Sequence, residues 1–316
     1  VLFRSRRPMA DLHEALRSLG ATVESTEGPV GSLPVRVSSS GLHGGTVGVR
    51  GDVSSQFVSA LMLLGPCLEG GLVLRIEGEL VSRPYVEMTA RVMTEFGAVV
   101  HVDDALISVA GGSYSARTYS VEPDFSSAAF PLLSLAHGHG TVRVPSLATA
   151  RLQGDSVVLE LLDRMGISVR VDGSDIVAHR PHGAPVRGVD VDLRDASDLV
   201  PALAVAACAA SGTTRISGIG FVRGKESDRI ADLVEGLRML GAHAEAHGDG
   251  ISVTGGRLEP QGMLRTHHDH RLAMAFSMAA AGGHTVELDD GDVVSKSWPG
   301  YFEDMHDVLG PFSERN

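Results

Sequence analysis

SDLVPALAVAACAASGTTRI, at residues 197–216, contains the structural pattern that decides the fold of this chain. It begins with polar residues that can cap a helix, continues as an apolar helix, stops at Gly212 and resumes as a β-branched strand. The same order recurs in segments that start at Ser54, Ser126 and Asp269. The four starts, at 54, 126, 197 and 269, are 72, 71 and 72 residues apart. A repeat at fixed spacing indicates a repeated structural unit.

A second pattern lies between these segments: an amphipathic helix that ends in a glycine, followed by two short strands around a turn. It occurs at residues 15–24, 92–102, 161–171 and 237–246. The glycines are typical helix C-caps. Each complete unit reads helix, strand, helix, strand, strand, which predicts an α/β fold with parallel sheet. An open solenoid is the alternative, but the length of the units and their varied polar caps favour compact domains.

Composition excludes several classes of function. The formal charge of −12 over 316 residues argues against a nucleic-acid-binding surface. The longest apolar runs, residues 199–210 and 272–281, are shorter than the roughly 20 residues that span a membrane. Only Cys67 and Cys208 are present, so no disulfide framework is indicated. We therefore expect a cytoplasmic protein with no membrane or nucleic-acid partner.

Several helix starts carry groups that suit an anion site, because helix N-termini offer free N–H groups and partial positive charge. Ser54-Ser55-Gln56 surrounds one such start, and Arg271 lies in the first turn of another, where a bound anion best explains a cation. The densest segment is Lys225-Glu226-Ser227-Asp228-Arg229. The alternative for that segment is a charged helix start with internal ion pairs.

Other candidate residues are ambiguous in isolation. Asp198 opens an apolar helix and is either its N-cap or a catalytic base, and the cap is the commoner case. Lys296 precedes an aromatic-proline turn and means little by itself. The His267-His268-Asp269-His270 segment suggests a metal, but it lacks the His-x-x-x-His spacing of a helical site. We expect no metal and no other cofactor.

Taken in order, these segments resemble the EPSP synthase (3-phosphoshikimate 1-carboxyvinyltransferase) family across the chain. The segments that carry the resemblance are Arg7-Pro8, residues 51–57, residues 82–85, Asp198 with its apolar helix, residues 225–229, residues 269–274 and Lys296. The related UDP-N-acetylglucosamine enolpyruvyl transferase is the competing enzyme assignment. It shares the fold but does not normally carry the segment found at residues 225–229.

The resemblance implies an enolpyruvyl transferase fold, an inside-out α/β barrel of two domains, each built from three βαβαββ units. The domain boundaries would be 1–121, on the shikimate 3-phosphate side, and 122–316, with the catalytic acid and base and the phosphoenolpyruvate side. Six units in total imply that the first one and a half, roughly 110 residues, are missing. The complete protein is expected to be a monomer.

The reaction implied is transfer of the enolpyruvyl group of phosphoenolpyruvate to the 5-hydroxyl of shikimate 3-phosphate, by addition and then elimination of phosphate. Asp198 would be the general base and Glu226 the acid, so Glu226 should stay neutral to a higher pH than Asp198. Shikimate 3-phosphate would contact Ser54, Ser55, Gln56, Ser82, Tyr85, Asp198 and Lys225. Phosphoenolpyruvate would contact Arg7, Gln56, Arg229, Arg271 and Lys296.

This sequence departs from the family pattern in several places. The N-terminal Lys-Ser pair, a nearby Arg and the Asn-x-Gly-Thr loop have no counterpart, so we expect these 316 residues to be inactive by themselves. A non-enzymatic phosphate-binding fragment is the alternative. Phe221 stands where many members have a polar contact to shikimate 3-phosphate, and Arg83 replaces a commoner lysine.

Overall fold

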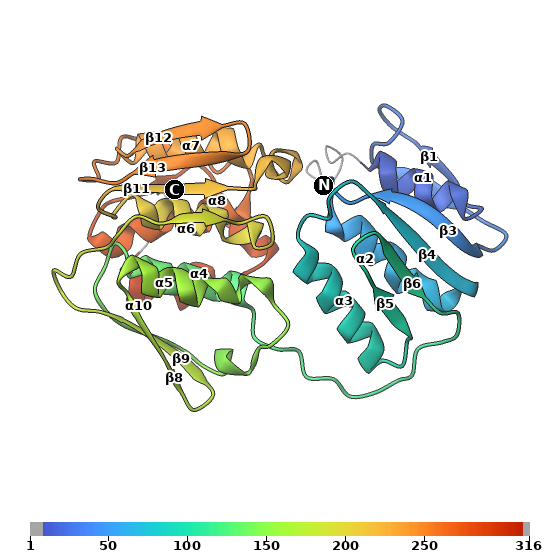
Figure 1. Ribbon diagram of the computed structural model, residues 1–316. Helices are drawn as coiled ribbons and strands as arrows, with labels where there is room; N and C mark the ends of the chain where they lie inside the picture. Colours follow the sequence, from blue (N-terminus) through green and yellow to red (C-terminus); the bar gives the residue numbers. More distant parts are fainter. Residues whose placement is uncertain (1–8, 312–316) are drawn as a thin grey trace. The chain divides into compact units, whose positions relative to one another are not determined.

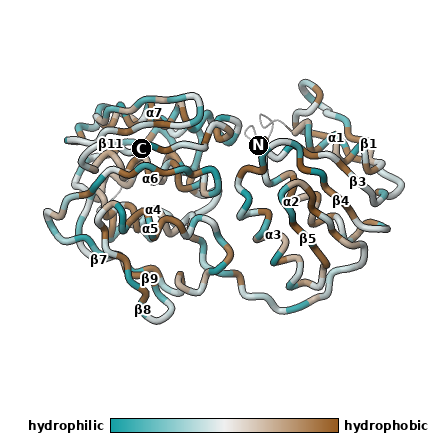
Figure 2. The backbone as a smooth tube through the Cα atoms, viewed as in Figure 1, coloured by the Kyte–Doolittle hydropathy of each residue, from teal (hydrophilic) through white to brown (hydrophobic). Residues whose placement is uncertain are grey.

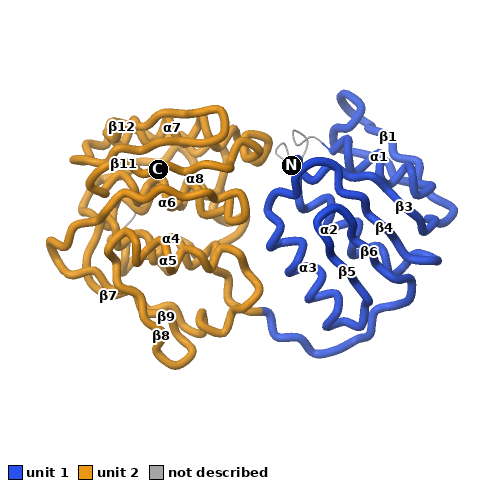
Figure 3. Tube along the Cα trace, in the orientation of Figure 1, with its two compact units in different colours: residues 1–121 blue, residues 122–316 orange. Residues whose placement is uncertain are grey.

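The chain divides into two compact units, residues 1–121 (unit 1) and residues 122–316 (unit 2), coloured separately in Figure 3. The computed structural model describes residues 9–311, so Arg7 lies outside the described residues. Each unit has its own hydrophobic core. The assignment of one substrate side to each unit stays a prediction.

Unit 1 contains one complete βαβαββ unit, preceded by a helix and a hairpin (Figure 1). The opening elements are α1 (Ala10–Ser18), β1 (Thr22–Ser25) and β2 (Val35–Ser38). The complete unit consists of β3 (His43–Arg50), α2 (Ser55–Leu64), β4 (Glu69–Glu77), α3 (Arg83–Glu95), β5 (Val100–Val102) and β6 (Leu106–Val109). Its sheet has the order β3-β4-β6-β5, in which only β3 and β4 are parallel.

Unit 2 repeats this plan (Figure 1). Its first part comprises α4 (Phe125–Ser134), β7 (Gly140–Val144), α5 (Val158–Met165), β8 (Ser168–Asp172) and β9 (Asp175–Arg180). Its second part comprises β10 (Asp190–Asp192), α6 (Val200–Ala207), β11 (Thr213–Ser217), α7 (Arg229–Met239), β12 (His243–His247) and β13 (Gly250–Thr254). The chain continues with β14 (Met263–Leu264), α8 (His270–Ser277), β15 (Glu287–Leu288), α9 (Tyr301–Asp304) and α10 (His306–Leu309).

The predicted repeat is confirmed as a local pattern. The four cap-helix-strand segments are α2-β4, α4-β7, α6-β11 and α8-β15, and the glycine-ended helices are α1, α3, α5 and α7. The prediction of parallel sheet is right only for the first two strands of a unit, such as β10 and β11. The last two strands of a unit form an antiparallel hairpin, because a short turn joins them and only a long crossover permits parallel pairing.

One expected strand is absent from the described structure. The sheet of the first repeat in unit 2 has only the order β7-β9-β8, with no strand before α4. The segment that precedes α4 runs across the boundary between the two units. Pro123 has no N–H to give to a ladder, and the Gln153 side chain binds its carbonyl instead. Side-chain contacts therefore replace sheet pairing at this point.

Parallel pairing places helix starts beside one another. In unit 1 the loops after β3 and β4 are joined where Val81 N donates to Gly51 O at 3.1 Å. In unit 2 the loops after β10 and β11 leave adjacent strands at the same edge, because Asp192 pairs with Ser217. Apolar stretches, brown in Figure 2, run along the helices and strands that these loops connect. None of the helices within residues 9–311 combines the length and apolar character of a membrane span.

A close helix contact in unit 2 gives a first test of this fold. A Cβ added at Gly236 of α7 would lie 2.2 Å from Phe276 Cζ of α8. We expect Gly236→Ala to lower the free energy of unfolding by about 1–3 kcal/mol, because overpacking outweighs the better helix propensity of alanine. The control is Gly248→Ala, where a Cβ meets nothing within 4 Å. Equal urea midpoints for the two variants would contradict this packing.

Candidate active site

Arg229 is the centre of a buried charge cluster in unit 2. It is the first residue of α7, and its side chain is 1% exposed. Its Nε donates to Asp269 Oδ2 at 2.7 Å, and its Nη2 lies 3.3 Å from Asp269 Oδ1, which is a bidentate pair. Its Nη2 also donates to Glu226 Oε2 at 2.9 Å, and its Nη1 to Asp198 Oδ1 at 3.2 Å. One guanidinium therefore connects three carboxylates.

Local capping fixes where these charges lie. Asp228 is the N-cap of α7 and accepts from the backbone N–H groups of Ile230 and Ala231. Asp269 is the N-cap of α8 and accepts from the N–H of Arg271 at 2.9 Å. Arg229 directly follows its cap and Arg271 lies two residues after its cap, so both arginines lie in a first helical turn. Asp269 therefore has two functions, capping α8 and holding Arg229.

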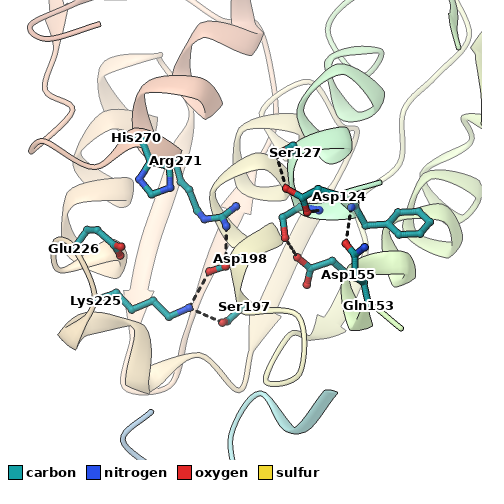
Figure 4. Close-up of polar contacts among 12 residues, drawn as sticks. Asp124, Ser127, Gln153, Asp155, Ser197, Asp198, Lys225, Glu226, His270 and Arg271 are labelled. Atoms are coloured by element: carbon teal, nitrogen blue, oxygen red, sulfur yellow. Dashed lines mark hydrogen bonds and ion pairs between the residues drawn. The ribbon is translucent and has the colours of Figure 1, made fainter. Parts of the chain in front are cut away.

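The Asp198 carboxylate is paired with three cationic side chains. Figure 4 draws two of them, Lys225 and Arg271. Lys225 Nζ lies 2.9 Å from its Oδ1, Arg271 Nη2 lies 2.8 Å from its Oδ2, and Arg229 completes the set. Burial alone would raise the pKa of Asp198, but Arg271, Lys225 and Arg229 together hold it well below the usual value. These surroundings favour the ionised form of Asp198.

The interpretation of Asp198 as a helix N-cap is wrong. Asp198 lies inside a short 3₁₀ helix, η4 (Ser197–Leu199), whose N-cap residue is Ala196. The α-helix α6 begins two residues later, at Val200, with Leu199 as its cap residue. The carboxylate is therefore held by the cation cluster, and this leaves the chemical role as the interpretation to consider.

Lys225 links this cluster to its surroundings. Its Nζ donates to Ser197 Oγ at 2.9 Å as well as to Asp198. Burial lowers the pKa of Lys225, and the Asp198 carboxylate opposes that effect. The ring centroid of Phe221 lies 5.8 Å from Lys225 Nζ. An aromatic face at this distance can attract the ammonium group.

Glu226 has two cationic neighbours. Its Oε2 accepts from Arg229, and its Oε1 lies 2.5 Å from Lys296 Nζ. The Glu226 side chain is 8% exposed, whereas that of Lys296, at the end of η7 (Asp292–Lys296), is 52% exposed. Lys296 is therefore the accessible partner of this ion pair, and Glu226 is the buried one.

The predicted shikimate 3-phosphate residues other than Asp198 and Lys225 lie in unit 1, which is described by itself. Ser54 is the N-cap of α2, and its Oγ accepts from the N–H of Gln56 at 3.3 Å. Ser55 and Ser82 are buried, and Ser82 has the left-handed φ of 53° immediately before α3. Tyr85 lies in the first turn of α3. Because β3 and β4 are parallel neighbours, these two helix starts share one edge of the sheet.

The histidine-rich segment does not gather its side chains around one point. His267 Nδ1 lies 3.7 Å from Asp232, His268 Nδ1 lies 3.4 Å from Asp290, and His270 Nδ1 lies 3.7 Å from Asp269. Three imidazoles thus face three different carboxylates. Within the part of the chain that the structure describes, no group of three or more histidine, cysteine or acidic residues could hold a metal ion.

Solved structures with the same fold define the class of protein. The enolpyruvyl transferase NikO from Streptomyces tendae matches with a TM-score of 0.71 at 20% identity, over 96% of this chain and 72% of that one. An EPSP synthase from Acinetobacter baumannii matches with a TM-score of 0.72 at 27% identity, over 98% of this chain and 73% of that one. The fold is that of the enolpyruvyl transferases.

Sequence comparisons narrow this class to one family. The family model of EPSP synthase (3-phosphoshikimate 1-carboxyvinyltransferase) matches residues 4–305. The 3-phosphoshikimate 1-carboxyvinyltransferase of Methanothermobacter thermautotrophicus is 38% identical over 302 residues, which is 96% of this chain and 70% of the relative. That of Shewanella sp. (strain W3-18-1) is 36% identical over 307 residues, 96% of this chain and 71% of the relative. The chain belongs to the EPSP synthase family, a family of transferases.

Proposed function

We propose that this protein transfers the enolpyruvyl group of phosphoenolpyruvate to the 5-hydroxyl of shikimate 3-phosphate, releasing phosphate. The observation that supports this most directly is the arrangement around Asp198. The ionised carboxylate of Asp198 is surrounded by Lys225, Arg229 and Arg271. A second carboxyl, that of Glu226, is paired with Arg229. Cations for anionic substrates and a pair of carboxyls for proton transfer thus occur together.

In the proposal, the substrate anions take over cations that carboxylates now hold. The carboxylate and phosphate of phosphoenolpyruvate would bind Arg229 and Arg271, whose planar guanidinium groups suit both anions. The half-exposed Lys296 would leave Glu226 and join them. Arg7, outside the described residues, and Gln56 are the remaining proposed contacts.

This exchange has consequences for the base. In the present arrangement Arg271, Lys225 and Arg229 hold the pKa of Asp198 well below its usual value, which disfavours proton abstraction. Once the bound anions share Arg271, the pKa of Asp198 rises, and its carboxylate can accept the proton of the 5-hydroxyl. The hydroxyl oxygen then bonds to C2 of phosphoenolpyruvate, and Glu226, which would take up a proton once Lys296 has left it, gives that proton to C3. In the second step the bond from C2 to the phosphate oxygen breaks and the leaving phosphate takes the proton that Asp198 holds. The Glu226 carboxylate takes a proton back from C3, which restores the double bond and returns both residues to their starting states.

Shikimate 3-phosphate is proposed to bind Ser54, Ser55, Gln56, Ser82 and Tyr85 in unit 1, together with Asp198 and Lys225 in unit 2. The N-cap position of Ser54 and the left-handed conformation of Ser82 place both hydroxyls at helix starts, where N–H groups favour a phosphate. The inside-out barrel and the division of substrates between the units belong to this proposal.

An acceptor assay tests the proposed function. The complete gene product is incubated with phosphoenolpyruvate and either shikimate 3-phosphate or UDP-N-acetylglucosamine, and phosphate release is measured. We expect turnover with shikimate 3-phosphate only, and turnover with the nucleotide sugar would contradict the assignment. The same assay on the 316-residue polypeptide tests the prediction that it is inactive by itself, which phosphate release would contradict.

A further inference from the structure

Asp155 is a buried carboxyl that the proposed reaction does not use. It lies in η3 (Gly154–Val157), and the residue is 1% exposed. Its Oδ2 accepts a short hydrogen bond from Ser126 Oγ, in the first turn of α4. Figure 4 shows the Asp155 carboxyl between the start of α4 and Asp198. The residue therefore connects a helix start with the charge cluster of unit 2.

The loop that carries Asp155 holds the beginning of α4 at several points. Gln153 Oε1 accepts from Phe125 N at 2.7 Å, and Gln153 Nε2 donates to Pro123 O at 2.7 Å. Asp124, the N-cap residue of α4, accepts from Ser126 N at 2.9 Å. The contact of Asp155 with Ser126 completes this set, so the position of the helix start depends on Asp155.

The charged groups that face Asp155 come from three elements. Asp198 lies on η4, Arg271 on α8 and Asp124 at the start of α4. Burial, followed by the charge of Asp198, raises the pKa of Asp155 to about 6, although Ser126 and Arg271 oppose the shift. Asp155 and Asp198 are thus neighbouring carboxyls with pKa values displaced in opposite directions.

We propose that Asp155 is a positioning residue for the Asp198 cluster, which favours anion binding when it is protonated and weakens it when it is ionised. The inference rests on the proposed function, because it concerns the same anion site. A protonated Asp155 keeps its hydrogen bond to Ser126 and leaves Arg271 to Asp198 and an incoming anion. An ionised Asp155 adds a second negative charge that competes for Arg271.

The charge balance of the cluster shows why one proton matters. With all its members ionised, the cluster has one more cation than carboxylates. The cations are Lys225, Arg229, Arg271 and Lys296, and the carboxylates are Asp198, Glu226 and Asp269. Ionisation of Asp155 would cancel that excess. In a site screened from water, this loss of net positive charge lowers the affinity for a dianion.

Sulfate is the probe for the test, because it remains a dianion from pH 5 to pH 8. Its affinity for the complete gene product is measured by calorimetry across this range, for the wild type and for Asp155→Asn. In the wild type we expect the affinity to fall by roughly three- to tenfold as the pH rises through about 6. Asp155→Asn, which can keep a hydrogen bond to Ser126, should lack that step and bind more tightly above it.

Two further variants separate a proton effect from a structural one. Ser126→Ala keeps the titrating carboxyl but removes a hydrogen bond that lowers its pKa, so the step should move to higher pH. This variant decides the question even if Asp155→Asn does not fold. Asp163→Asn removes an exposed carboxyl from α5 and should leave the step unchanged.

The two proposals fail in different ways. Absence of sulfate binding at every pH would overturn the anion site itself, and this inference with it. Sulfate binding with parallel pH profiles in the wild type and Asp155→Asn, or an unmoved step in Ser126→Ala, would overturn the role of Asp155 alone. Nearby histidines titrate in the wild type and in every variant. Their titration therefore cannot produce a difference between these proteins in the pH dependence of sulfate affinity.

Discussion

Replacing Arg229 with methionine is expected to lower the free energy of unfolding of unit 2 by about 3–5 kcal/mol, because breaking a buried ion pair leaves uncompensated charge. Asp269, fully buried, would lose its bidentate partner, and Asp198 and Glu226 would lose their shared cation. Trp298 is the only tryptophan of the chain and lies in unit 2, so its fluorescence during urea unfolding reports on this unit.

The matched control is Arg223→Met, six residues earlier. Arg223 is also paired with an aspartate, Asp228 at 3.0 Å, but both side chains are more than a third exposed. An exposed pair contributes at most about 1 kcal/mol, so this variant should unfold almost like the wild type. Adding Asp269→Asn to Arg229→Met should recover part of the lost stability, since it removes one unpaired carboxylate. Equal losses for Arg229→Met and Arg223→Met would contradict the buried cluster.

The repeat could be predicted because its signals are local. A polar cap, an apolar run and a terminal glycine act within one helix, as at α8, where Asp269 caps the first turn, or at α5, where Gly166 adopts a φ of 90°. Strand pairing depends on tertiary contacts. The prediction of parallel sheet therefore holds only for the first two strands of a unit. The strand expected before α4 does not form, because tertiary contacts decide the structure there as well. The Gln153 side chain binds that segment in place of a neighbouring strand.

In the candidate site, too, local patterns could be predicted and contacts between distant residues could not. The segment at residues 225–229 was recognisable because its charges are adjacent in sequence. Its most buried ion pair joins Arg229 to Asp269, which is 40 residues away, and nothing in the sequence indicates which acid meets which base. The sequence suggests a bound anion as the partner of Arg271. In the structure the guanidinium faces Asp198, which is 73 residues away. Asp155 had no sequence signal, since its partner is 29 residues away.

Glu226→Gln is expected to reduce turnover by roughly 10²- to 10⁴-fold, as for the loss of a general acid, while shikimate 3-phosphate binding stays measurable. Glu226 contacts Arg229 and Lys296, and neither belongs to the proposed shikimate 3-phosphate contacts. Glutamine keeps the size of the side chain, but its single carbonyl oxygen can replace only one of the two oxygens that face Arg229 and Lys296, and its amide has no acidic proton to give to C3. The control is Glu235→Gln, which changes an exposed residue on α7, the helix that follows Glu226.

Asp198→Asn should reduce turnover similarly and should also strengthen phosphoenolpyruvate binding. The asparagine removes the negative charge that Lys225, Arg229 and Arg271 share, so these cations become available to substrate anions. We therefore expect phosphoenolpyruvate to bind more tightly to Asp198→Asn than to the wild type, with binding measured by calorimetry on the complete gene product. Near-normal turnover in either variant would remove that residue from the acid–base pair. Weaker phosphoenolpyruvate binding in Asp198→Asn would contradict the idea that Asp198 holds the cations until the substrate arrives.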